Sequence, residues 1–271
     1  MPPKTLTGDE KKAIALAIFL SVVFLSIGYA QGNITFAQKK EMGGHGSGEK
    51  EKPQQEITLG VQLGMLDDTY QGNNTWTTLI SSVDDYAVVW VNNTGNVTDT
   101  YTISISEVPD GWSVSQDKMA VTVNPEDEMG WVILRFSVPP GAKNGAVVVT
   151  AESQTDPSVR DNITINCNVE GTDAQVSYVG DTIMVSYTVT DENGTQLDSG
   201  TLPVTAGEPE VGYGNQLAYI DGFYLGVLGM RKPDVSHSGE TKNIVVPPEL
   251  AYGEDMGTLY FTLTVESDLP G

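Results

Sequence analysis

Residues 56–169 alternate between apolar and polar side chains over short runs, and this period of two is the pattern of β-strands with one buried face. Turn motifs separate the runs, among them Pro-Asp-Gly at 109–111, Pro-Pro-Gly at 139–141 and Lys-Asn-Gly at 143–145. No helical period of useful length interrupts them. The sequence therefore predicts an antiparallel β-sandwich at residues 56–170. The apolar positions of its clearest strands are Tyr101, Ile103 and Ile105, then Val132, Leu134, Phe136 and Val138, then Ile163, Ile165, Cys167 and Val169.

The charge balance and the single cysteine limit the chemistry and the partners of the chain. The sequence has 14 Lys+Arg against 36 Asp+Glu, a formal net charge of -22. Such a surface repels nucleic-acid phosphates, so we expect no nucleic-acid partner. Cys167 is the only cysteine, which rules out an intrachain disulfide and indicates a core-filling role. His45 stands alone among glycines, so neither a metal site nor a cofactor is expected.

Residues Ala13 to Ala30 are uncharged and mostly apolar, and they follow Lys11 and Lys12. Their length is close to the minimum that spans a bilayer as a helix, and the preceding lysines favour a cytoplasmic N-terminus. We therefore predict a single-pass membrane anchor within residues 1–30, with everything after it outside the cytoplasm. A cleaved signal peptide is the alternative, because Gly-Tyr-Ala at 28–30 has the small-x-small form of a cleavage site, and the protein would then be secreted.

Residues 31–55 are rich in glycine and in charged side chains, and this composition predicts a flexible linker. An exported chain also meets the glycosylation machinery, so Asn-x-Ser/Thr sequons are candidates for glycosylation. The alternative is a β protein that is simply rich in Thr and Asn. The sequons lie at Asn33, Asn73, Asn92, Asn96, Asn162 and Asn193.

Two stretches of the predicted sandwich, VNNTGNVTDTY at 91–101 and Pro-Asp-Gly-Trp at 109–112, resemble the Ig-like modules of prokaryotic surface proteins and secreted glycosidases. The resemblance implies a spacer or adhesion unit with a surface-protein partner, and such a fold fixes no activity. Exposed tryptophans would allow a carbohydrate platform, whereas core packing is the alternative for at least two of them. The tryptophans are Trp76, Trp90, Trp112 and Trp131.

Residues 171–271 form a second predicted unit, which begins after a short polar junction at 170–173. The junction has no apolar run to bury, so the two units are predicted to fold independently. Residues 183–189 alternate into an Asn-Gly hairpin turn, and residues 259–265 alternate as a closing strand. Between them, the apolar residues of Tyr219 to Met230 fall at helical spacing, which predicts a short amphipathic helix.

Residues 245–253 read VVPPELAYG and place two prolines and a tyrosine directly after an apolar strand end. Pro248 fixes its own φ and biases Pro247 toward extended geometry, so the chain aims Tyr252 along a preset path. An ordinary strand-to-turn connection is the alternative. Together with the hairpin, the helix and the closing strand, this run resembles the FKBP-type peptidyl-prolyl isomerases over about residues 180–266. The resemblance implies an antiparallel sheet wrapped on a short helix.

The same resemblance implies a proline-sized pocket and assigns its residues. Leu197 stands where a phenylalanine is customary and Phe223 where a tryptophan is common, while the loop that follows Tyr252 is too short for the usual flap. The implied catalytic residues are Tyr187, Asp198, Ile220 through its backbone N–H, and Tyr252; the implied substrate-binding residues are Leu197, Tyr219, Phe223, Val246 and Phe261.

These features predict an extracytoplasmic, membrane-anchored peptidyl-prolyl cis-trans isomerase that assists the folding of exported, proline-containing polypeptides. A dry aromatic slot would favour the twisted X-Pro amide by desolvation, without a nucleophile or a metal. The alternative is a non-catalytic surface protein, structural or binding, that uses a degenerate FKBP-like domain as a docking module.

Overall fold

The computed structural model describes residues 56–125, 129–209, 219–253 and 256–268. Thr58–Gly271 forms one compact unit. The predicted anchor at 13–30, the predicted linker at 31–55 and the sequon at Asn33 lie outside the described residues. Within the described part of the chain, no helix is both long and apolar enough to cross a bilayer.

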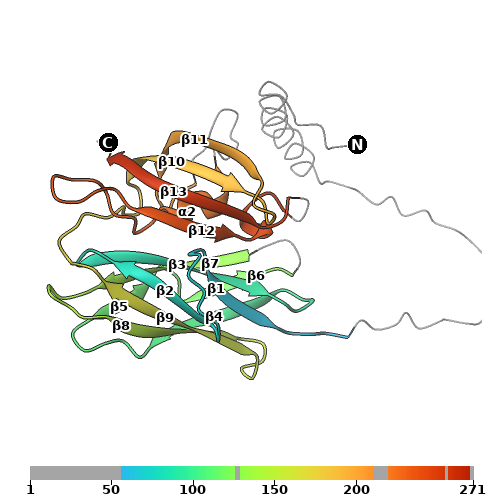
Figure 1. The fold of residues 1–271 in the computed structure, drawn as a ribbon. Coiled ribbons are helices and arrows are strands. Elements are labelled where there is room, and N and C mark those ends of the chain that lie inside the picture. Colours follow the sequence, from blue (N-terminus) through green and yellow to red (C-terminus); the bar gives the residue numbers. More distant parts are fainter. Residues whose placement is uncertain (1–55, 126–128, 210–218, 254–255, 269–271) are drawn as a thin grey trace, which may run out of the picture. The chain divides into compact units, whose positions relative to one another are not determined.

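The first part of the unit is a sandwich of two sheets, drawn in blue to yellow-green in Figure 1 and called the sandwich lobe below. One sheet has the strand order β1-β3-β7-β5 and the other the order β2-β9-β8-β4-β6. All pairs are antiparallel as predicted, except that β2 runs parallel to β9. The strands are β1 (Val61–Met65), β2 (Thr75–Ile80), β3 (Asp84–Asn93), β4 (Asp99–Ser106), β5 (Ser113–Gln116), β6 (Ala120–Val123), β7 (Met129–Ser137), β8 (Gly145–Ser153) and β9 (Arg160–Val169).

The sandwich core confirms the alternation in the sequence. Tyr101 and Ile103 of β4, Leu134 and Phe136 of β7, and the β9 residues around Cys167 all point between the two sheets and are buried. Burial raises the pKa of the Cys167 thiol to about 12, so this cysteine is an inert core residue at neutral pH.

The second part, called the C-terminal lobe, is a four-stranded antiparallel sheet with the order β11-β10-β13-β12, drawn in orange and red in Figure 1. Pro203 is tolerated in β11 because that strand lies at the sheet edge. The elements are β10 (Thr182–Thr190), β11 (Gln196–Thr205), α2 (Asp221–Gly226), β12 (Thr241–Val246), the 3-10 turn η1 (Pro248–Leu250) and β13 (Leu259–Asp268).

Helix α2 is shorter than the predicted helix at 219–230, because it ends at Gly226 and a left-handed turn follows at Gly229. It is also not amphipathic, since nearly every residue of it is buried. A Cβ at Gly222 would come within 2.2 Å of Val246, and one at Gly226 within 2.4 Å of Ile244. The two glycines therefore let the helix lie directly on β12.

The two lobes share a hydrophobic cluster that the sequence did not predict. In β3 and β7, alternate side chains face the sandwich core, and the intervening ones form a second apolar face that packs with the C-terminal lobe. Trp90 and Trp131 are cross-strand partners on this face. The polar junction at 170–173 gave no sign of this contact. The sandwich residues of the shared cluster include Leu66, Tyr86, Val88, Trp90, Met129, Trp131 and Ile133.

The tryptophans give no exposed platform in this arrangement. Trp76 is buried in the sandwich core, with Tyr70 packed over it at 4.7 Å between ring centroids. Trp112 packs against the same core, and Trp90 and Trp131 lie in the shared cluster. Core packing therefore accounts for all four rings.

Candidate functional site

Four aromatic rings of the C-terminal lobe gather around the first turn of α2. Phe223 of α2 is central: its ring centroid lies 5.5 Å from that of Tyr187, 5.6 Å from Tyr219 and 5.6 Å from Phe261. The ring of Tyr187 stands edge-on to Phe223, at 83°. Phe223 and Phe261 are buried, whereas Tyr187 and Tyr219 are half-buried. The cluster thus has an apolar floor and a polar rim of hydroxyl groups.

The hairpin of β10 and β11 positions the rim. Tyr187 donates its hydroxyl hydrogen to Asp198 at 2.8 Å. A register shift opposite Val189 and Thr190 leaves Leu197 as the extra residue of a β-bulge, and a bulge is one way to re-aim side chains. Gly200 lies opposite Tyr187 in the ladder, and a Cβ there would come within 3.2 Å of its ring. No motif in the sequence singles out this glycine.

Burial and nearby charge keep the tyrosine hydroxyl groups of this rim protonated, so that they can donate hydrogen bonds. Burial, followed by the hydrogen bond and the charge of Asp198, raises the pKa of Tyr187. Burial, followed by the charge of Asp198, also raises the pKa of Tyr252, whose side chain is 44% exposed. Both hydroxyl groups therefore keep their protons at neutral pH.

Two donors near the cluster have no partner among the described residues. Ile220 precedes α2 with extended backbone geometry; its carbonyl accepts from the Phe223 N–H, but its own N–H donates to no described group. The Tyr252 hydroxyl likewise makes no hydrogen bond to a described residue. A backbone N–H and a phenol beside a dry aromatic surface are suited to hold peptide carbonyl oxygens.

The structure thus brings together most of the residues that the resemblance assigned to the pocket. Tyr187, Asp198, Tyr219, Phe223 and Phe261 are joined by direct contacts. Leu197 and Ile220 pack against the same cluster as partly buried residues.

Val246 differs from the others. Its side chain is fully buried and packs against Gly222, so its place is to support α2 rather than to offer a surface to a ligand.

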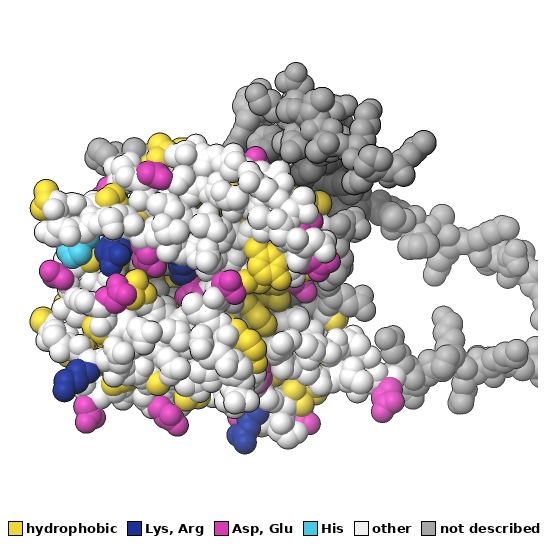
Figure 2. All heavy atoms as spheres, viewed as in Figure 1, with side chains coloured by type: hydrophobic (Ala, Val, Ile, Leu, Met, Phe, Trp, Pro, Cys, Tyr) yellow, Lys and Arg dark blue, Asp and Glu magenta, His cyan; other side chains and the backbone are white. Residues whose placement is uncertain are grey.

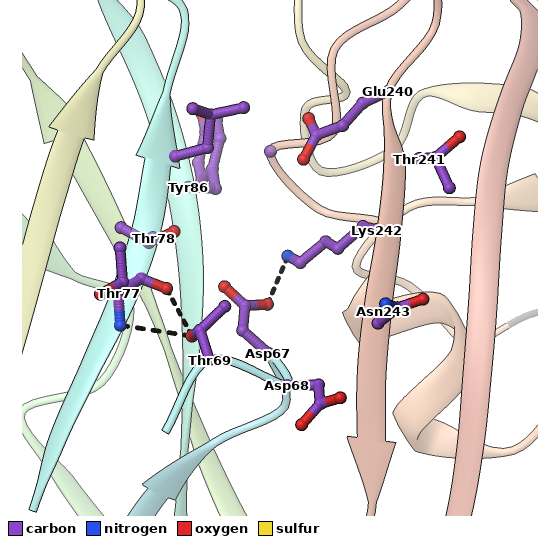
Figure 3. Close-up of a pocket in the computed structure, with 12 residues that line it drawn as sticks. Asp67, Asp68, Thr69, Thr77, Thr78, Tyr86, Glu240, Thr241, Lys242 and Asn243 are labelled. Carbon is purple, nitrogen blue, oxygen red and sulfur yellow. Dashed lines mark hydrogen bonds and ion pairs between the residues drawn. The ribbon is translucent and has the colours of Figure 1, made fainter. Parts of the chain in front are cut away.

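A cavity of about 200 Å³ lies elsewhere, where the two lobes meet, and Figure 3 shows the residues that line it. Lys242 of β12 and Asp67 of the sandwich lobe point toward each other and form an ion pair at 2.6 Å. Burial works against the charged form of Lys242, but the charges of Asp67 and Glu240 outweigh it and raise the lysine pKa. The lysine is thus engaged with its carboxylate neighbours, and we assign this cavity to the interface between the lobes.

Hydrogen bonds between backbones also cross this boundary. The Val245 N–H donates to the Leu66 carbonyl at 2.7 Å, and the Asp68 N–H donates to the Asn243 carbonyl at 3.0 Å. The segment after β1 therefore covers the outer edge of β12 like a short extra strand.

The face of the molecule in Figure 2 carries many acidic side chains and few basic ones, and hydrophobic side chains gather along the boundary between the lobes.

The predicted glycosylation sites differ in their exposure to solvent. Asn73, Asn162 and Asn193 are exposed, whereas Asn92 and Asn96 are half-buried, and the Asn96 side chain accepts a hydrogen bond from the Thr58 N–H. Glycosylation stays a prediction, and the three exposed sites are the accessible ones.

Residues 174–265 match the family model of the FKBP-type peptidyl-prolyl cis-trans isomerases. The match supports an FKBP-type domain at these residues, which are those of the C-terminal lobe. No curated protein matches the chain.

Among solved structures, the chain is similar to a FixG-related protein from Vibrio parahaemolyticus, at 8% identity and a TM-score of 0.30, over 41% of this chain and 96% of that one. The periplasmic chaperone SfaE is similar at 11% identity and a TM-score of 0.28, over 54% of this chain and 82% of that one. The E. coli chaperone DraB is similar at 9% identity and a TM-score of 0.31, over 55% of this chain and 88% of that one. The strand order of the two packed sheets, rather than these distant likenesses, defines the sandwich.

Proposed function

We propose that the C-terminal lobe is a peptidyl-prolyl cis-trans isomerase whose substrate-binding surface is the aromatic cluster around Phe223. The observation that carries the proposal is the combination of an apolar floor with two donors that have no acceptor among the described residues, the Ile220 N–H and the Tyr252 hydroxyl. The family match at 174–265 supports the same activity.

The mechanism follows from the resistance of the X-Pro amide to rotation. Rotation breaks the conjugation between nitrogen and carbonyl, and the planar amide is the more polar and better hydrated form. Removing water against the rings of Phe223 and Phe261 disfavours the planar form, while a donor such as the Ile220 N–H holds a substrate carbonyl in position. Lowering the barrier by about 4 kcal/mol would speed the reaction roughly 10³-fold.

A proline-peptide isomerisation assay on the full-length chain tests the proposal, with Tyr252→Phe as the informative variant. This change keeps the ring and removes only the hydroxyl, so we expect the rate to fall roughly two- to tenfold with little change in melting temperature. Tyr260→Phe is the matched control, because Tyr260 points to the opposite face of β13 from Phe261.

Two results would count against the isomerase. A chain that binds proline peptides but accelerates nothing would favour the docking module, for which the replacement of an aromatic residue by Leu197 is the supporting observation. A sharp bell-shaped pH profile between about pH 6 and 8 would contradict a mechanism that has no titrating group in this range.

We propose in addition that residues 13–30 anchor the protein, with the C-terminal lobe outside the cytoplasm and acting on exported polypeptides. Protease added to intact cells should then digest the part after Ala30, while the protein stays in the membrane fraction. Recovery of a soluble chain that starts at Gln31 would show that the segment is a cleaved signal peptide instead.

A further inference from the structure

A second hollow, of about 530 Å³, lies between the two lobes. On the sandwich side it is lined by β6 and by Trp131 of β7, and on the other side by Asp221 and Glu249. Asp221 directly follows Ile220, and Glu249 lies three residues before Tyr252. On the C-terminal side, the hollow is therefore lined by the first residue of α2 and by the turn that leads to Tyr252.

One edge of strand β6 lies at this hollow and has no strand partner among the described residues. In the described sheet, β6 is the last strand and pairs only with β4. The Met119 carbonyl accepts from the Ile103 N–H, and hydrogen-bonded pairs alternate along an antiparallel ladder. The backbone groups of Ala120 and Thr122 consequently point away from β4. Both residues are exposed, so this edge can accept an added strand.

The basic side chain at the hollow is held by neighbouring groups, whereas the two acidic side chains have no cationic partner among the described residues. Lys118 donates to the Trp131 carbonyl at 2.9 Å, and its ammonium group lies 4.7 Å from the centroid of the Trp131 ring. By contrast, among the described residues Asp221 accepts only the Tyr224 hydroxyl hydrogen, and Glu249 has no cationic partner there. A basic side chain of a bound peptide would meet two carboxylates here.

From these observations we infer that an extended, proline-containing client continues from the aromatic cluster across the hollow, adds as a short strand to the free edge of β6, and places a Lys or Arg residue near Asp221 and Glu249. The placement of the client's proline at the aromatic cluster rests on the proposed function. The inferred role of the sandwich lobe is to hold the client. A peptide of twelve residues spans about 40 Å when extended, at about 3.3 Å per residue.

The test compares three fluorescent peptides on the full-length chain. One is a proline tetrapeptide that reaches only the cluster, the second extends it to twelve residues with a lysine near the proline, and the third carries glutamate in place of that lysine. We expect the lysine dodecamer to bind more tightly than both of the others. Glu249→Gln should reduce its preference over the glutamate peptide, measured as the ratio of the two Kd values.

Thr122→Pro examines the strand edge itself, since proline removes the N–H that points into the hollow. It should weaken binding of the lysine dodecamer about three- to tenfold and leave the tetrapeptide unaffected. Thr122→Val is the matched control: it also loses the hydroxyl contact with Thr100 but keeps the backbone donor. Should Thr122→Pro not fold, the Glu249→Gln ratio still decides the matter.

Equal affinity of the wild-type chain for the tetrapeptide and the lysine dodecamer would overturn the inference and leave the isomerase standing. Conversely, binding that depends on Thr122 without any acceleration would keep the inference and remove the isomerase. Wild-type dimers that dissociate in Thr122→Pro, measured by sedimentation, would assign the edge to a second copy of the chain and so contradict a client at this position.

Discussion

The hydrophobic cores of the two lobes are built differently. The core of the sandwich lobe consists entirely of residues of that lobe. The described residues of the C-terminal lobe form one sheet and a six-residue helix, and the hydrophobic cluster of this lobe includes Leu66, Val88 and Met129 of the sandwich lobe. A small lobe exposes much of its apolar surface unless another element covers it. The second face of β3 and β7 provides this cover, so the sandwich lobe is a structural support of the C-terminal lobe.

The boundary between the lobes also differs in character from either core. It contains the buried pair of Lys242 and Asp67, with Glu240 close by, as well as the apolar face around Trp90. A buried ion pair contributes little net stability, but removing one partner strands the other charge. The boundary is thus more sensitive to single substitutions than the aliphatic sandwich core is to conservative ones.

The largest expected effect follows from separating the lobes. A fragment of residues 56–170 should unfold in one cooperative transition, because its core is complete. A fragment of residues 172–271 should show no cooperative transition, since it loses the shared cluster and the backbone pairing of β12 with Leu66 and Asp68. Circular dichroism melts of both fragments and of the full chain would measure this.

This expectation is the opposite of the prediction from the polar junction at 170–173, which was that the two units fold independently. A C-terminal fragment that melts at the same temperature as this lobe in the full chain would show that the shared cluster adds nothing to its stability, and the comparison between the two cores would then fail.

The next effect concerns the ion pair. Lys242→Met removes the cation that faces Asp67 and leaves the carboxylates of the boundary without it, so the free energy of unfolding should fall by about 3–5 kcal/mol. The double variant with Asp67→Asn should recover part of this loss. Arg135→Met is the control, because the Arg135–Asp84 pair is exposed and is expected to be worth about 0–1 kcal/mol. Urea denaturation of the four proteins measures the differences, and equal losses for Lys242→Met and Arg135→Met would contradict a special role for the boundary.

The sequence could predict the elements with a strict period of two, because each buries one face in its own lobe. The strands around Ile103, Phe136 and Ile165 are where the alternation places them. It could not predict the second apolar face of β3. The side chains that face the sandwich core are apolar, and because Val88 and Trp90 between them are apolar as well, the strand shows no clear alternation. A strand that is buried on both faces reads as a continuous apolar run, and only the position of a partner shows what covers it.

The pocket residues could be predicted through the resemblance, since the runs around Tyr187 and Tyr252 are distinctive. Their relative geometry could not, because it depends on the β-bulge at Leu197 and on the close approach of Gly200 to the Tyr187 ring. The short loop after Tyr252 was visible in the sequence, whereas the hollow lined by Glu249 requires the packing of the two lobes.

The smallest expected effect is the pH dependence of the free energy of unfolding that Asp85 causes, and it tests a single group at the boundary. This fully buried residue lies at the contact with the C-terminal lobe, since a Cβ on Gly229 would come within 2.9 Å of its carboxylate. Burial raises the pKa of Asp85 to about 7, although the N–H groups of Ser81 and Tyr86 oppose the shift. Glu240 and Lys242 are the charged groups of the C-terminal lobe that act on it.

Because the folded state favours the protonated acid while the unfolded chain releases its proton near pH 4, Asp85 contributes stability at low pH that is lost as the pH rises toward 7. From pH 5 to pH 8 this loss amounts to about 2–3 kcal/mol. Asp85→Asn has no such proton, so its stability relative to the wild type should rise by that amount over the same interval in urea denaturation. Asp156→Asn provides the control, because hydrogen bonds from Ser158 lower the pKa of this exposed carboxyl and it does not titrate in that range. If Asp85→Asn follows the pH profile of the wild type, the carboxyl is already ionised in the folded protein, and Lys242 rather than a proton neutralises it.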